Sequence, residues 1–472
     1  MTKAPRTAEG RSLVLTALVI SCAFLMETLD STILIAALPA VAADFGVAPL
    51  RVNLAVTIYL VTLAAMIPAS SWLADRFGAR RVFLWAIFGF MVTSVGAALS
   101  SSLTMLVVMR VLQATAGAMM TPVGRLLLIR AAPKDELANA IAWMSMPVLI
   151  GPVLGPMLGG WLVTYASWPW IFLVNLPIGA AALLIVPRIL PADAGTERRS
   201  FDLRGFLLCA AVLAAAQLLL DQLVHPFLPA WARWGLAALV PLAALGYWRH
   251  AARAARPALD LTLWRLRLFR IGFFAGGLSR LGLNAVPFLL QLQLQLGFGW
   301  SAARAGTTVF AVAAGALVLK PLMRRVLGWL GFRATLFWNG LLGAVLTGVL
   351  ALLGPQTPQA LLLVVVLAYG VARSLQFNAV NTLLYADVPA ERQSASTALG
   401  GVGQQVSMAL GISVAAILVA QFEAAGLAPP QSAISAAMIV VALLTALSGA
   451  LFLFSLTAQD GAAVSRRRAR PS

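Results

Sequence analysis

Two carboxyl groups stand three residues apart within a long apolar stretch near the start of the chain, at Glu27 and Asp30. This spacing places both side chains on adjacent parts of one helix face. Two neighbouring carboxyls do not both ionise easily, so such a pair takes up a proton readily. We therefore predict that the two residues carry protons. The alternative is that Asp30 only satisfies polar groups on neighbouring helices.

Arg110 is the natural charge partner of these carboxyls, because a guanidinium in an apolar stretch needs an acid or carbonyl oxygens around it. Gln113, Gly117 and Thr121 fall on or near the same helix face. A face of polar and small residues is typical of a cavity wall. Gln113 is therefore predicted to contact substrate.

A second set of polar residues lies in the C-terminal half. At 100° per residue, Arg280, Asn284 and Gln291 point the same way along one apolar stretch, and Arg373 and Gln376 do so along another. No acid lies deep in an apolar stretch of this half, so the anionic group of a substrate is the predicted partner of the two arginines. The alternative is hydrogen bonding between helices, which accounts for the amides better than for the arginines.

The composition indicates that most of the chain is surrounded by lipid rather than by water. Of the 472 residues, 61% are hydrophobic and 11% are charged, and the mean hydropathy is +0.91. A soluble domain carries about 25% charged residues, so soluble enzymes are excluded. The two cysteines, Cys22 and Cys209, lie in apolar stretches and provide neither a disulfide framework nor a metal site. We expect no metal and no cofactor, with a proton gradient as the energy source.

Apolar stretches long enough to cross about 30 Å of hydrocarbon recur along the whole chain. The predicted fold is an all-α polytopic membrane protein with about fourteen spans: two six-helix bundles and two additional transmembrane helices between them. The predicted parts are an N-terminal tail (1–11), the first bundle (12–190), a linker (191–202), the two extra helices (203–250), a basic linker (251–270), the second bundle (271–457) and a basic tail (458–472).

Basic residues determine the predicted orientation. The chain has 34 Lys and Arg against 16 Asp and Glu, and most of the basic residues fall in alternate loops and in both tails. Such loops stay on the cytoplasmic side, so both termini are predicted to be cytoplasmic, in the inner membrane of a bacterium. The charge is spread over many short loops, which argues against nucleic acid as a partner.

Several motifs resemble those of the major facilitator superfamily. They are the loop Leu73–Arg81 (LADRFGARR), the run that starts at Arg110, and the glycine-proline segment Gly151–Gly160 (GPVLGPMLGG). The runs Leu29–Ile33 and Trp168–Gly179 resemble the fourteen-span drug:proton antiporters, the EmrB/QacA group. Within that group, the runs Gly117–Leu126 and Tyr165–Trp168 are most similar to the MdtD/HsrA branch.

The resemblance implies roles for individual residues. It implies that Asp30 and Arg110 couple transport to protons, whereas the role of Glu27 rests on its position alone. The loop residues Asp75, Arg76 and Arg80 would form a latch between the two halves; the alternative is a solvated loop. The small and kinked face of the fifth span would form a bendable seal, or serve only in helix packing, through Gly151, Pro152, Gly155, Pro156 and Gly159.

Together these features predict a proton-coupled antiporter that exports small amphipathic or anionic compounds by alternating access, of the multidrug-efflux type. The alternatives are a dedicated exporter of an anionic metabolite or carboxylate chelate, and a uniporter on the same fold. The expected partners are a small-molecule substrate, protons and the lipid bilayer, with a monomer favoured. No set of nucleophile and base, and no metal-ligand cluster, favours an enzyme.

Overall fold

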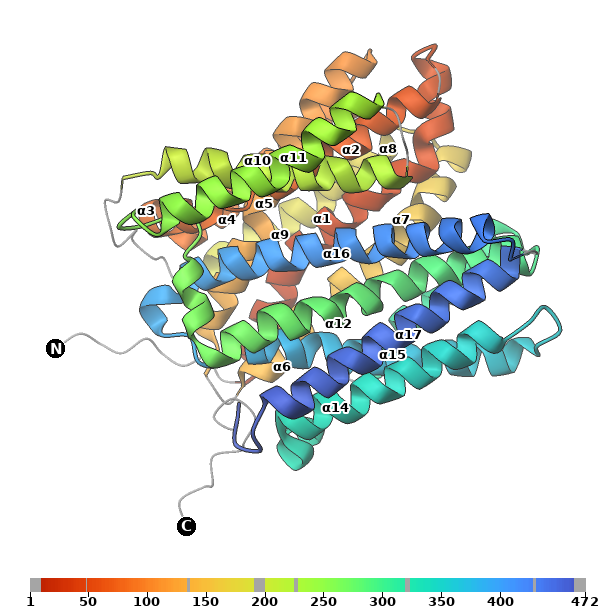
Figure 1. Cartoon of the computed structure of the whole chain (residues 1–472). Helices are drawn as coiled ribbons and strands as arrows, with labels where there is room; N and C mark the ends of the chain where they lie inside the picture. Colours follow the sequence, from red (N-terminus) through yellow and green to blue (C-terminus); the bar gives the residue numbers. More distant parts are fainter. Residues whose placement is uncertain are drawn as a thin grey trace. The chain divides into compact units, whose positions relative to one another are not determined.

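The computed structural model describes residues 10–47, 49–133, 136–190, 200–224, 228–318, 323–427 and 430–461. Every regular element within these ranges is a helix (Figure 1), which confirms the predicted all-α class. Long apolar runs form helices in a membrane protein because a helix satisfies its own backbone hydrogen bonds where water is absent.

The helices of the N-terminal part are α1 (Gly10–Asp44), α2 (Pro49–Met66), α3 (Ala69–Phe77), α4 (Ala79–Ala98), α5 (Leu103–Ala131), α6 (Leu137–Met144), α7 (Met146–Tyr165), α8 (Trp170–Leu173) and α9 (Asn175–Ile189). The following helices are α10 (Leu203–Val224), α11 (Ala230–Ala251), η1 (Leu261–Arg265), α12 (Arg267–Leu292), η2 (Gln293–Gly297), α13 (Ala302–Val318), α14 (Met323–Leu352), α15 (Gln359–Leu384), η3 (Ala390–Arg392), α16 (Gln393–Ala424) and α17 (Pro430–Ser455).

Among the described residues, ten helices are long and apolar enough to cross a membrane, or eleven if the bent pair α2 and α3 is one span. The count of about fourteen therefore stays a prediction.

Several helices bend or break at proline or glycine. α2 and α3 bend by 57° around the segment that contains Pro68, whose ring nitrogen cannot donate a helical hydrogen bond. Gly78, with φ 91°, separates α3 from α4. Within α14, the backbone leaves helical geometry at Gly331, with φ 71°. Such positive φ values cost glycine little because it has no β-carbon.

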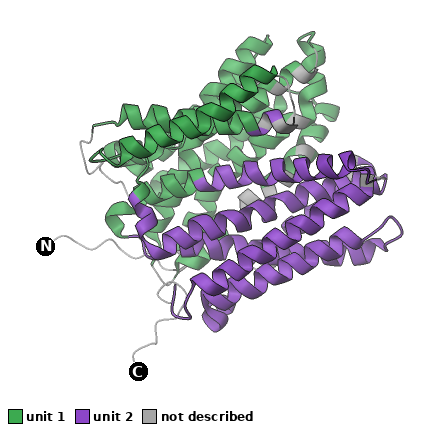
Figure 2. Ribbon diagram, viewed as in Figure 1, with its two compact units in different colours: residues 1–219, 228–261, 389–402 green, residues 220–227, 262–388, 403–472 purple. Residues whose placement is uncertain are grey.

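The chain divides into two compact units (Figure 2). Unit 1 comprises Met1–Leu219, Leu228–Leu261 and Pro389–Val402, and unit 2 comprises Leu220–Phe227, Thr262–Val388 and Gly403–Ser472. The extra helix α11 and most of α10 thus belong to unit 1, whereas α16 is divided between the units. The domain limits predicted from the sequence stay predictions.

In unit 1, α1 is the central helix and packs against α2, α5, α6, α7 and α9. In unit 2, α15 packs against α12, α13 and α14, and α17 packs against α12 and α14. The polar residues predicted to work in transport lie mainly on α1 and α5 in unit 1 and on α12 and α15 in unit 2. The fold therefore places them on helices that pack against several others within their own unit.

Candidate functional site

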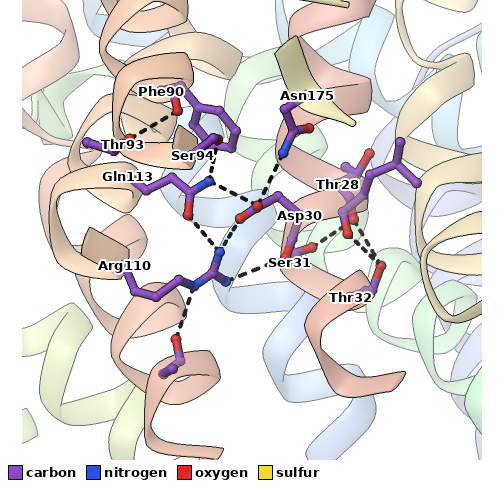
Figure 3. A network of polar contacts seen from close by, with 12 residues as sticks. Thr28, Asp30, Ser31, Thr32, Phe90, Thr93, Ser94, Arg110, Gln113 and Asn175 are labelled. Atoms are coloured by element: carbon purple, nitrogen blue, oxygen red, sulfur yellow. Dashed lines mark hydrogen bonds and ion pairs between the residues drawn. The ribbon is translucent and has the colours of Figure 1, made fainter. Parts of the chain in front are cut away.

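A buried ion pair joins the two central helices of unit 1 (Figure 3). Asp30 of α1 and Arg110 of α5 are both 0% exposed, and an Nη of Arg110 donates to Oδ2 of Asp30. The predicted pairing of Asp30 with Arg110 is thus present in the structure. Removing either partner of such a buried pair would leave an uncompensated charge in the interior.

Neutral amides complete the surroundings of the Asp30 carboxylate. Gln113 donates to Asp30 Oδ1 at 3.0 Å and to the Ser94 hydroxyl at 2.8 Å, and its carbonyl oxygen accepts from Arg110 at 2.8 Å. Asn175 of α9 donates to the same Oδ1 atom at 3.4 Å. Four helices thus supply this network. Because these bonds occupy both ends of the amide, we assign Gln113 to the carboxyl network, and its contact with substrate stays a prediction.

Helix α2 holds Arg110 from another side. The Nε atom of Arg110 donates to the carbonyl oxygen of Ala55 at 3.2 Å, and its guanidinium carbon lies 4.0 Å from the ring centroid of Tyr59. Ala55 and Tyr59 are one helical turn apart, so they present neighbouring groups on one face of α2. The guanidinium is therefore fixed by a carboxylate, an amide, a carbonyl and an aromatic ring.

Glu27 has its own partners, one turn before Asp30. The Thr121 hydroxyl of α5 donates to Glu27 Oε2 at 2.5 Å. Arg125, one further turn along α5, is close enough to attract the Glu27 carboxylate electrostatically. Arg125 lies within α5, which continues to Ala131, and is 2% exposed. The two carboxyls of the predicted pair thus have different partners on α5.

The glycines of the predicted seal pack against α1. A β-carbon at Gly151 would lie 2.1 Å from the Thr28 hydroxyl oxygen, and one at Gly159 would lie 2.5 Å from the Ile33 carbonyl oxygen. Pro152 and Pro156 lie within α7, but their side chains are outside the described part of the chain. The small face therefore brings α7 close to the helix that bears Glu27 and Asp30, and the role of a seal stays a prediction.

The predicted latch residues lie in helices, Asp75 and Arg76 at the end of α3 and Arg80 at the start of α4, and all have contacts inside unit 1. Asp75 lies 3.7 Å from a nitrogen of Arg130, and Arg80 donates to the Pro187 carbonyl oxygen at 3.0 Å. The guanidinium carbon of Arg76 lies 5.5 Å from the ring centroid of Trp72, with which it makes a cation–π contact. A latch between the halves stays a prediction.

The two arginines of unit 2 lie at the contact between α12 and α15. Arg280, 1% exposed, donates to Asn381 Oδ1 at 3.0 Å. Arg373, 8% exposed, donates through Nε to the Leu283 carbonyl oxygen at 3.0 Å. The sequence contains no Asp or Glu from residue 261 to residue 386. This stretch therefore carries two buried positive charges and no acidic residue.

The amides predicted to join these arginines do not all gather there. Asn284 donates to the Arg280 carbonyl oxygen at 2.7 Å, and Gln291 is half-buried further along α12. Gln376 faces α14, where its carbonyl oxygen accepts from Asn339 at 2.9 Å and its nitrogen donates to a backbone oxygen. The structure thus brings Arg280 and Arg373 to one helix contact and directs Gln376 to another.

The sequence analysis did not assign three residues to the surroundings of the Asp30–Arg110 pair: Ser94, Asn175 and Tyr59. One signal was available, because Asn175 is a strongly polar residue inside an apolar run, and such residues are costly in a membrane. Within the described residues, no group of three or more His, Cys, Asp or Glu side chains is arranged to hold a metal ion.

Comparison with known proteins agrees with this architecture. The sequence profile of the Major Facilitator Superfamily matches residues 20–412 and 272–471. A relative from Serratia proteamaculans, named multidrug resistance protein MdtD, is 38% identical over 404 residues, which cover 86% of this chain and 84% of the relative. A protein of the same name from Cronobacter sakazakii is 39% identical over 408 residues and 86% of each chain.

Two solved structures are similar in fold. The human organic anion transporter MFSD10 (TETRAN) aligns with a TM-score of 0.66 at 17% identity, covering 95% of this chain and 100% of that one. The proton:xylose symporter XylE aligns with a TM-score of 0.66 at 14% identity, covering 97% of this chain and 100% of that one. At these identities the likeness concerns the fold alone.

Proposed function

The chain belongs to the major facilitator superfamily, and we propose that it is a proton-coupled antiporter that exports small amphipathic or anionic compounds. Its membership and its MdtD-named relatives identify it as a multi-pass membrane transporter with a drug-efflux role. Proton coupling, antiport and an anionic cargo are the finer parts of the proposal.

The buried pair of Asp30 and Arg110 is the observation that carries proton coupling. Protonation of Asp30 removes its charge and with it the attraction that holds α5 to α1. Arg110 then keeps its positive charge in the protein interior without that partner, which is unfavourable unless the helices or the solvent rearrange. A proton at Asp30 thus changes the relative stability of two arrangements of these helices, which is what coupling requires.

Export follows if proton binding and cargo binding favour different arrangements. A proton that enters from the periplasm neutralises Asp30 and favours release of cargo to that side. Loss of the proton to the cytoplasm restores the ion pair and returns the transporter to its starting arrangement. This order makes the proton gradient the energy source, with no cofactor.

The arginines of unit 2 support an anionic cargo. Arg280 and Arg373 place two buried positive charges at one helix contact, in a stretch of the chain without acidic residues. A carboxylate or a similar anion on the cargo would balance this charge through charge-assisted hydrogen bonds. The cargo also needs apolar surface if it partitions from the membrane, as multidrug substrates do.

The orientation is proposed from the basic residues. With both termini in the cytoplasm of a bacterium, the loops that hold most of the 34 Lys and Arg also lie there. The inner membrane is the membrane that maintains such a proton gradient. A monomer is the proposed working unit.

Transport into proteoliposomes tests the proposal with two dyes of opposite charge, carboxyfluorescein and ethidium. We expect wild-type protein to move carboxyfluorescein against its concentration gradient only when a pH gradient is imposed. Asp30→Asn should abolish this dependence while it still permits binding. Asp44→Asn is the matched control, because Asp44 lies at the far end of α1 and accepts from Trp168 at 2.9 Å.

Two outcomes would contradict the proposal. Equal transport with and without the gradient would identify a uniporter. If Arg280→Ala and Arg373→Ala leave carboxyfluorescein transport unchanged, the anionic part of the proposal is wrong. Ethidium controls for general damage, since loss of both dyes indicates a defective protein rather than a lost anion site.

A further inference from the structure

The hydroxyl of Tyr59 is a buried polar group without a hydrogen-bond partner in the described part of the structure. The side chain is 0% exposed and lies on α2, beside the Asp30 network. A buried tyrosine hydroxyl normally finds a partner, because leaving one unsatisfied is costly. An unsatisfied group at a functional site therefore calls for a role.

The Tyr59 ring is held in place by Arg110. The guanidinium carbon lies 4.0 Å from the ring centroid, so the ring stacks on the cation that pairs with Asp30. The hydroxyl extends to Gly117 of α5, where a β-carbon would lie 3.4 Å from its oxygen. The ring therefore has a structural partner, whereas among the described residues the hydroxyl has no hydrogen-bond partner.

Gly117 lies on α5 halfway between the residue that binds Asp30 and the residue that binds Glu27. Gln113, four residues before it, donates to Asp30, and Thr121, four residues after it, donates to Glu27. Four residues span about 6 Å of helix, so the hydroxyl beside Gly117 lies about that far along α5 from each of these two residues.

The charged groups around this hydroxyl are those of the carboxyl network. From α1, Glu27 and Asp30 both lie close enough to act on Tyr59 electrostatically, and from α5 Arg110 does so. These are the described helices that pack against α2. The hydroxyl thus lies among the two predicted proton carriers and the cation that pairs with one of them.

We propose that the Tyr59 hydroxyl relays protons between Glu27 and Asp30, a step that rests on the proposed proton coupling. The phenolic oxygen accepts the carboxyl proton of Glu27 while its own O–H proton passes to the Asp30 carboxylate. Tyr59 ends with one proton, as it began, and rotation of the hydroxyl resets it. Glu27 is left ionised near Arg125, and Asp30 is left neutral beside Arg110.

Tyr59→Phe separates this role from a structural one, because it keeps the ring on Arg110 and removes only the hydroxyl. The measurement is time-resolved infrared spectroscopy of the full-length protein after a rapid acid jump. The carbonyl band of the protonated Asp30 carboxyl is assigned by its loss in Asp30→Asn. We expect Tyr59→Phe to slow the appearance of this band on the order of 100-fold, as loss of a positioned proton-transfer group does, with the final amplitude retained.

Tyr369→Phe is the matched control. Tyr369 of α15 is also buried, at 1% exposed, and its hydroxyl also lacks a partner in the described structure, but it lies in unit 2. We expect the Asp30 band of this variant to appear at the wild-type rate.

A double variant tests whether the two residues share one path. Glu27→Gln should slow protonation of Asp30, and adding Tyr59→Phe should slow it no further. Gly117→Ala is a second probe if Tyr59→Phe does not fold, since its β-carbon would contact the hydroxyl oxygen at 3.4 Å, limit the rotation of this group and slow the same step.

The outcomes distinguish the two proposals. A wild-type rate in Tyr59→Phe, or additional slowing in the double variant, overturns the relay and leaves proton coupling intact. If the wild-type protein shows no proton uptake by Asp30, the proposed function itself fails.

Discussion

A β-carbon on Gly155 of α7 would stand 2.0 Å from the hydroxyl oxygen of Thr32 on α1. The Thr32 hydroxyl accommodates this approach by turning back to its own helix, where it donates to the Thr28 carbonyl oxygen at 3.1 Å. Thr32 is two residues beyond Asp30. Gly155, which has no side chain, therefore permits the close approach of α1 and α7 near the buried Asp30 carboxylate.

Gly155→Ala is expected to push α1 away from α7 and to impair proton-driven transport. The added methyl group would collide with Thr32, and overpacking of this kind costs about 1–3 kcal/mol. The measurements are the thermal stability of purified protein and gradient-driven dye uptake into proteoliposomes.

Gly160→Ala is the matched control for this prediction. It adds the same methyl group to the same helix, where no atom of a neighbouring element in the described structure lies within 4 Å of the new β-carbon. Stability and transport of this variant should equal those of the wild type. Equal behaviour of the two variants would show that the close approach of α1 and α7 is unimportant.

The charge pair of Asp30 and Arg110 predicts strong non-additivity. Arg110→Gln leaves the Asp30 carboxylate buried without its cation and is expected to cost about 3–5 kcal/mol of stability. Asp30→Asn in addition removes the remaining charge, so the double variant should melt at a higher temperature than Arg110→Gln alone. Neither variant should show gradient-driven transport.

Independent effects of the two substitutions would contradict this picture. If the double variant loses as much stability as the two single variants combined, Asp30 and Arg110 do not depend on each other in the folded protein. Thermal melting of the three variants beside wild-type protein in one detergent provides the comparison.

Charged residues of this site could be predicted from sequence because charge is rare and costly in an apolar helix. Asp30 and Arg110 were found in this way, and the structure joins them. Asn175 and Tyr59 escaped notice because a single amide or hydroxyl in an apolar run does not indicate which helix it will face. Only the packing of α9 and α2 on α1 and α5 brings them to the pair.

Helix faces were easier to predict than the partners of those faces. The four-residue spacing of Gly151, Gly155 and Gly159 indicated a small face, but the spacing cannot identify α1 as the helix that packs there. The partner of a basic residue is equally hard to predict. The structure buries Arg125 near the end of α5 and brings it close enough to Glu27 to attract the carboxylate.

Asp387, in the connection after α15, gives a prediction about pH. Its Oδ2 accepts from the Leu268 backbone N–H at 2.9 Å, at the start of α12. Burial raises the pKa of Asp387, and this effect outweighs the hydrogen bonds from the backbone, which lower the pKa. The folded protein therefore favours the protonated carboxyl more than the unfolded chain does.

The sign of the stability effect follows from this raised pKa. The ionised carboxylate destabilises the folded state at neutral pH, and this loss disappears as the pH falls through the folded pKa toward the unfolded value of about 3.9. Asp387→Asn keeps an oxygen for Leu268 without a charge. It should melt above the wild type near pH 7, and the difference should vanish near pH 4.

Thermal melting over this pH range, with Asp44→Asn as a control for the loss of one carboxylate, tests the prediction. A variant that melts below the wild type at neutral pH would mean that the charge of Asp387 is favourable. In that case the attraction between this carboxylate and the N-terminus of α12 outweighs its burial.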